Sequence, residues 1–111
     1  MAQLPNHQRA EIDIAKLRDY CLSPTHLRGR HKARVFAAAL GIHAADAEWL
    51  RDIILQSLAD ADAVMDEASQ FGQRWHVDLL LTRQNRRAVI RTAWLIRVSQ
   101  SNPRLITAWV L

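Results

Sequence analysis

The sequence predicts an α+β fold, with three N-terminal helices packed on one face of a C-terminal three-stranded antiparallel sheet connected as a meander. Apolar residues recur at helical spacing through the first half of the chain and alternate with a period of two in the second half. Short polar stretches join the alternating segments, which favours antiparallel hairpins. Helices that precede strands are typical of the α+β class.

The first two predicted helices are bounded by proline and glycine. Apolar residues from Ile12 to Leu22 lie close to helical spacing, and this helix ends before Pro24 because proline disfavours helix in the preceding residue. The second helix opens at either Thr25 or Gly29. It ends at Gly41, since glycine commonly follows the last helical residue.

The third predicted helix has the cleanest amphipathic pattern in the chain. Asp46 is its expected N-cap. Its apolar face consists of Leu50, Ile53, Ile54, Ser57, Leu58 and Ala61. Residues 60–70 either extend this helix or form a loop, and the sequence leaves both alternatives open.

Three strands are predicted, at residues 74–81, 88–97 and 105–111. Their more apolar positions are assigned to the core: Trp75, Val77, Leu79, Ile90, Thr92, Trp94, Ile96, Ile106, Ala108 and Val110. Because side chains alternate between the two faces of a strand, the opposite face carries a polar set. This set, which we call the open face, contains Arg74, His76, Asp78, Arg91, Arg97, Thr107 and Trp109.

Composition predicts a single domain over residues 1–111, with residues 1–10 as a flexible tail. The chain has no apolar run near membrane-spanning length and no apolar leader, and its one cysteine cannot form an intrachain disulfide. We therefore expect a cytoplasmic protein that does not enter a membrane. No zinc-type Cys/His spacing and no glycine-rich phosphate loop is present, so no metal or cofactor is expected.

Charge is divided unevenly along the chain. Residues 1–43 carry seven bases and three acids, residues 44–67 seven acids and one base, and residues 68–111 seven arginines and one acid. A basic surface beside a separate acidic helix indicates a protein that meets a polyanion on one side.

The residue types on the open face suit RNA. Arginine binds phosphate through two parallel hydrogen bonds, and Trp109 can stack an unpaired base. Metal-free RNA cleavage needs a base, an acid and cations for the phosphorane, which histidine and arginine supply. The alternative is an ordinary solvated sheet face, because antiparallel sheets are often wet on one side.

A second basic cluster, residues 26–34, lies at the start of the second predicted helix. Exposed N–H groups there favour an anion, and the alternative is pairing of these bases with the acidic third helix. The residues predicted to bind nucleic acid on the two surfaces are Arg28, Arg30, Arg74, His76, Arg97 and Trp109.

Five segments resemble an uncharacterised family of small bacterial domains. They read KLRDYCLSPTH at 16–26, GRHKARVF at 29–36, FGQRW at 71–75, RTAWLIR at 91–97 and PRLITAW at 103–109. The resemblance covers residues 14–111. It implies a toxin–antitoxin pairing, because members of the family are commonly encoded beside a small antitoxin-like barrel protein.

The order of helices followed by antiparallel strands also resembles the superfamily of the barnase, EndoU, colicin and RelE-like ribonucleases. Those enzymes place Lys or His on an early helix, Arg on a middle strand and Ser, Thr or Tyr near the last strand. On this chain the resemblance implies His31 or Lys32, Arg91 and Thr107. The chain departs from the uncharacterised family, its nearer relatives, in the first hairpin, where a turn with glycine is more usual and residues 83–86 contain none.

The resulting hypothesis is a small, metal-independent endoribonuclease of a toxin–antitoxin pair that cleaves RNA by 2′-OH attack. Arg91 binds the scissile phosphate, His31 is the general acid or base, Lys32 stabilises the phosphorane and Thr107 orients the phosphate, with His76 in reserve. The expected partner is an acidic antitoxin.

Two alternatives stay open. The first is a non-catalytic binding module, such as a phage-type inhibitor, that grips protein or nucleic acid with the same basic face. The second is a homodimer through the open face or an edge strand, with Leu95, Leu105 and Trp109 exposed there.

Overall fold

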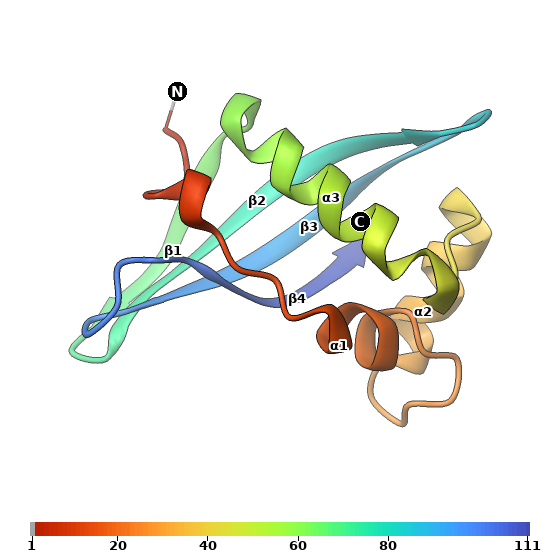
Figure 1. The fold of residues 1–111 in the computed structure, drawn as a ribbon, viewed down its shortest axis with the longest axis horizontal. Helices are drawn as coiled ribbons and strands as arrows, with labels where there is room; N and C mark the ends of the chain where they lie inside the picture. The colour runs from red at the N-terminus through yellow and green to blue at the C-terminus, as the bar shows by residue number, and fades with distance from the viewer. Residues whose placement is uncertain (1) are drawn as a thin grey trace.

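The computed structural model describes residues 2–111, and Met1 lies outside the described residues. The regular elements are α1 (Ile14–Lys16), a π-helical turn (Leu17–Cys21), α2 (Arg30–Leu40), α3 (Ala47–Ser57), β1 (Ala63–Ser69), β2 (Gly72–Arg83), β3 (Arg86–Arg97) and β4 (Arg104–Val110). Three short 3-10 turns lie at His7–Arg9, Ala44–Asp46 and Leu58–Asp60. Figure 1 shows the arrangement of these elements.

The sheet has four antiparallel strands in the order β1-β2-β3-β4, so the prediction of three strands is wrong. The additional strand, β1, occupies residues that the sequence left as helix or loop. Only Ala63 of β1 is buried, and residues 64–69 are exposed. A strand exposed on both faces carries no alternation of apolar and polar residues, which is the signal that sequence reasoning uses.

The helical segments begin and end close to the expected residues. The Asp13 carboxylate accepts a hydrogen bond from the Ala15 N–H, 3.0 Å away, at the start of α1. Gly29 precedes the first residue of α2, and Gly41 follows its last residue. Within residues 2–111, no helix is both long enough and apolar enough to cross a membrane.

The core lies between the helices and one face of the sheet. Phe36 of α2, Leu50 of α3 and Trp94 of β3 have no exposed surface and belong to one apolar cluster. Figure 1 shows α3 running across β2 and β3. The predicted core face of these two strands is confirmed at Val77, Leu79, Ile90, Thr92 and Trp94, which are all buried, whereas Trp75 and Ile96 at its end are half-buried.

On β4 the predicted alternation is wrong at its first residues. Trp94 pairs with Leu105 while Ala93 pairs with Thr107, so Ile106 is an extra residue in a β-bulge. Leu105 therefore faces the core and is 3% exposed. It cannot form the exposed dimer patch expected for it.

Residues 2–10, expected as a flexible tail, pack against the body of the protein. Leu4 is 1% exposed and belongs to the core cluster. The N–H of Ala63 donates to the carbonyl of Ala2 over 2.7 Å. The segment thus covers the start of β1.

Candidate functional site

Lys32 is the centre of a contact between α2 and β4. Its Nζ donates a hydrogen bond to Thr107 Oγ1 over 3.1 Å. The same Nζ lies 5.3 Å from the ring centroid of Tyr20 and 5.2 Å from that of Trp109, within range for cation–π attraction. Two predicted catalytic residues, Lys32 and Thr107, are therefore in direct contact. We call Tyr20, Lys32, Thr107 and Trp109 the lysine cluster.

The backbone around the π-helical turn positions this cluster. Gly29 packs so tightly on this turn that an added Cβ would collide with the Tyr20 carbonyl, whose carbon would lie 2.7 Å away. Buried Cys21 contacts Thr107 Oγ1 through its Sγ over 3.6 Å. Glycine at position 29 thus allows α2 to approach the turn and bring Lys32 to the edge of the sheet.

His31 and His26 have different environments at the start of α2. His31 is exposed and lines a shallow hollow of about 340 Å³ with Lys32 and Trp109. Nδ1 of His26 accepts hydrogen bonds from the N–H groups of Arg28 and Gly29, at 3.0 and 3.1 Å. These two N–H groups are among the donors expected to attract an anion at the start of α2, and they already donate to the His26 ring.

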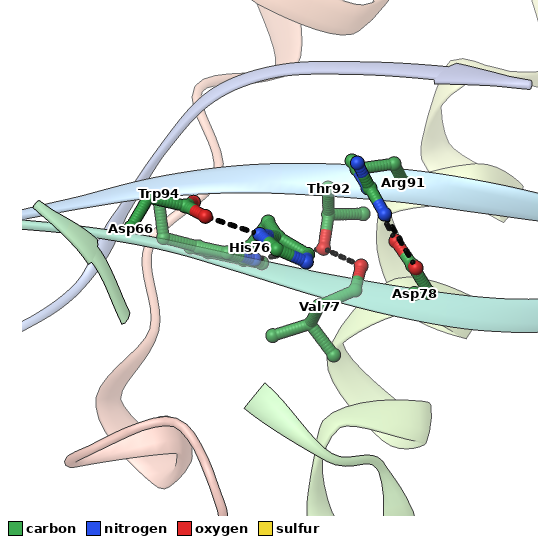
Figure 2. Close-up of polar contacts among 7 residues, drawn as sticks. All are labelled: Asp66, His76, Val77, Asp78, Arg91, Thr92 and Trp94. Carbon is green, nitrogen blue, oxygen red and sulfur yellow. Dashed lines mark hydrogen bonds and ion pairs between the residues drawn. The ribbon is translucent and has the colours of Figure 1, made fainter. Parts of the chain in front are cut away.

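Arg91 forms a two-point ion pair with Asp78 on the neighbouring strand (Figure 2). The Nε–Oδ1 and Nη2–Oδ2 distances are 2.8 and 2.9 Å. The hydrogen bonds from Arg91 lower the pKa of Asp78 below its ordinary 3.8, although burial opposes them. Arg91 is also the cross-strand partner of Trp109, so it adjoins the lysine cluster.

His76 forms an unexpected pair with Asp66, shown in Figure 2. Asp66 is the extra residue of a bulge in β1, and its Oδ1 lies 2.7 Å from His76 Nδ1. Because an ionised carboxylate only accepts, Nδ1 carries the proton and Nε2 of a neutral ring keeps a free lone pair. Sequence reasoning missed Asp66 because it missed β1.

The strand register aligns these groups across the open face. His76 pairs with Ala93, and Ala93 pairs with Thr107. His76 and Thr107 are thus separated by two strand spacings, roughly 10 Å, with only a methyl side chain between them. We call His76, Ala93 and Thr107 the open-face row.

Two of the basic residues near the C-terminus support the fold instead. Arg83 Nη2 lies 3.0 Å from Asp46 Oδ1, and the guanidinium covers the Trp49 ring at 4.9 Å. Arg86 donates to two carbonyl groups at the end of α2, those of Ala37 and Ala38, at 3.2 Å each. These arginines anchor the β2–β3 hairpin to the helices.

The other predicted nucleic-acid contacts are exposed arginines at two separate places. Arg28 and Arg30 lie at the start of α2, and Arg74 and Arg97 lie at the far end of the sheet. Their side chains make no ion pair with any residue of 2–111. No group of three His, Cys, Asp or Glu side chains in this part of the chain could hold a metal ion.

Fold and site together define a small α+β domain whose helices cover one face of an antiparallel meander while the other face carries paired ionisable residues. A family model described as "Domain of unknown function (DUF6883)" matches residues 3–111, and the chain belongs to that family. Comparison with curated proteins found no match, and neither did comparison with solved structures.

Proposed function

We propose that this protein is a metal-independent endoribonuclease of toxin type, which cleaves RNA by attack of a 2′-OH on the adjacent phosphate. The observation that carries the proposal is the open-face row, with His76 and its Asp66 partner on one side of Ala93 and Thr107 with Lys32 on the other. A general base and a cationic phosphate contact thus lie on the two strands that flank Ala93.

In the proposed reaction, the scissile phosphate lies over Ala93. Nε2 of His76 removes the 2′-OH proton, and Asp66 stabilises the imidazolium that forms. Lys32 and Thr107 donate to the phosphorane oxygens. His31, beside Lys32, returns a proton to the leaving 5′-oxygen, which yields a 2′,3′-cyclic phosphate and a 5′-OH.

Arg91 has a modified role in this proposal. Asp78 accepts from Nε and from one N–H of Nη2, which leaves the two N–H groups of Nη1 and the second one of Nη2 to meet a phosphate oxygen. The ion pair fixes the direction of the guanidinium but offsets its charge. Arg91 is thus a weaker phosphate contact than a free arginine, and Lys32 carries more of the charge stabilisation.

Substitution of His76 tests the proposed base. His76→Ala should lower the rate of RNA cleavage by roughly 10²- to 10⁴-fold, the usual contribution of a general base. His7→Ala removes a histidine from the first 3-10 turn, which is not part of the open-face row, and should leave the rate unchanged. Circular dichroism checks folding of both variants. Equal cleavage by folded His76→Ala and wild-type protein would remove His76 from the mechanism.

A binding module without catalysis is the second candidate, and it is favoured by a different observation. Leu80 and Val89 are cross-strand partners on the open face and are 58% and 39% exposed. An apolar pair next to ionic pairs fits a protein partner, such as the acidic antitoxin expected from the family resemblance, or a second copy. Tight, salt-dependent binding of a protein partner or of RNA, without RNA cleavage, would favour this candidate.

A further inference from the structure

The end of the sheet remote from α2 carries an exposed aromatic ring beside arginines. Phe71, in the β1–β2 turn, is 75% exposed, and Val98, just after β3, is 71% exposed. The Val98 N–H donates to the Phe71 carbonyl over 3.1 Å, which joins the two turns. Figure 1 shows these turns meeting at the end of the sheet away from α2.

Gly72 fixes the backbone beside this ring. Its φ is 147°, a conformation that residues with side chains rarely adopt. A Cβ at position 72 would collide with the Ile96 carbonyl oxygen and lie 2.9 Å from the Arg97 Cα. Phe71 is therefore held against the end of β3 by a backbone contact that only glycine permits.

Two arginines lie beside the ring on the open face. Arg74 and Arg97 are exposed and, with Phe71, Leu95 and Val98, line a hollow of about 660 Å³. Neither forms an ion pair with residues 2–111, although Glu67 is the cross-strand partner of Arg74. We call Phe71, Arg74, Leu95, Arg97 and Val98 the Phe71 platform.

We propose that the Phe71 platform binds single-stranded RNA, with a base stacked on Phe71 and phosphates held by Arg74 and Arg97. Exposed aromatic rings next to cations are the usual means of binding unpaired nucleotides without reading their sequence. The platform continues the surface of the proposed cleavage site, because Arg91, Ala93, Leu95 and Arg97 alternate on the same face of β3. This substrate assignment depends on the proposed function.

The distance between the two places sets the length of RNA needed. Ala93, where the scissile phosphate is placed, and Arg97 are four residues apart on β3, or roughly 13 Å. An extended strand of a few nucleotides spans that distance, whereas a paired duplex cannot place an unstacked base on Phe71. The platform therefore selects unpaired RNA over duplex.

The test is binding of a fluorescein-labelled 2′-O-methyl oligouridylate of about ten nucleotides, a length typical of single-strand binders. This probe cannot be cleaved, because its 2′-oxygens are blocked. Phe71→Ala should weaken binding roughly tenfold, and Phe71→Trp should retain it. Leu111→Ala removes a 59% exposed apolar side chain elsewhere and should bind as wild type does.

A second pair of variants tests the arginines. Arg97→Ala should weaken binding and reduce the slope of log affinity against log salt by roughly 0.7, the value for one phosphate contact on a single strand. Arg87→Ala removes an equal charge near the opposite end of β3 and should change the slope less.

Equal affinity of wild type and Phe71→Ala for the probe would overturn the inference. So would a Phe71-dependent preference for a labelled glutamate–leucine peptide, which would indicate an acidic protein partner. Wild-type binding of the probe with no cleavage of ordinary RNA would sink the proposed reaction and leave the platform intact. Cleavage of ordinary RNA, together with equal binding of the probe by wild type and Phe71→Ala, would overturn the platform and leave the proposed reaction intact.

Discussion

Thr92 satisfies two polar groups inside the core. It has no exposed surface, and its Oγ1 donates to the Val77 carbonyl and accepts from Trp94 Nε1, both over 2.8 Å (Figure 2). These bonds link β2, β3 and the largest fully buried side chain of the core. Thr92 thereby lets a tryptophan N–H be buried at low cost.

Thr92→Val keeps the shape of the side chain but leaves the buried N–H of Trp94 without its partner. We expect it to lower the free energy of unfolding by about 2–3 kcal/mol. Thr92→Ser, which keeps the hydroxyl, should cost only about 1 kcal/mol for one lost methyl group. Urea denaturation measures both. Equal stability of the two variants would contradict the role of the hydroxyl.

Asp46 makes stability depend on pH through its ion pair with Arg83. The hydrogen bond from Arg83 lowers the pKa of Asp46 below 3.8, helped by the His43 N–H. A lowered pKa means that the contribution is present above the unfolded pKa and is lost as pH falls through the folded one.

Between pH 5 and pH 3, wild-type protein should therefore lose more stability than Asp46→Asn, by on the order of 1 kcal/mol. Both side chains of the pair are about one-quarter exposed, which limits solvent screening. Denaturant titration at each pH provides the values. Parallel pH profiles for the two proteins would show that this carboxylate does not contribute.

At the scale of elements, the β2–β3 hairpin carries a residue in an unfavourable conformation. Arg83 pairs with Arg86, which leaves Gln84 and Asn85 as a two-residue turn. Gln84 has a φ of 55°. The turn is unusual in sequence because it lacks glycine. In the structure the consequence is that Gln84, which has a side chain, adopts the positive φ that glycine adopts without strain.

Gln84→Gly should stabilise the protein by about 1 kcal/mol, because glycine adopts positive φ without strain. Asn85→Gly, at a position without positive φ, should give no such gain. Thermal unfolding compares the two variants. A higher melting temperature for Asn85→Gly than for Gln84→Gly would contradict the assigned turn geometry.

The elements that the sequence predicts well have one buried and one exposed face. α2, α3, β2 and β3 all show the expected periodicity. β1 was missed because six of its seven residues are exposed, and the β4 alternation failed because a bulge at Ile106 shifts the register by one residue. Both failures affect the site, since β1 supplies Asp66 and the bulge brings Thr107 opposite Ala93.

At the scale of the whole molecule, the uneven charge along the sequence becomes only partly a basic face. Arg83 and Arg86 hold the hairpin on the helices, and Arg91 is offset by Asp78. Arg74 and Arg97 retain unpaired charge within the described chain. Counting charges along the sequence predicts that the C-terminal half is rich in arginine. It does not predict which arginines are held by cross-strand or tertiary partners and which are left to contact a ligand.

The measurement that tests the central claim most directly is the chemistry of the ends that the protein leaves on RNA. Wild-type protein, incubated with a short unpaired oligoribonucleotide and chelator, should give fragments with 2′,3′-cyclic phosphate and 5′-OH ends by mass spectrometry. Lys32→Ala, which breaks the contact with Thr107, should give almost none. Intact oligonucleotide with folded wild-type protein, or equal fragments from folded Lys32→Ala, would contradict cleavage at the open-face row.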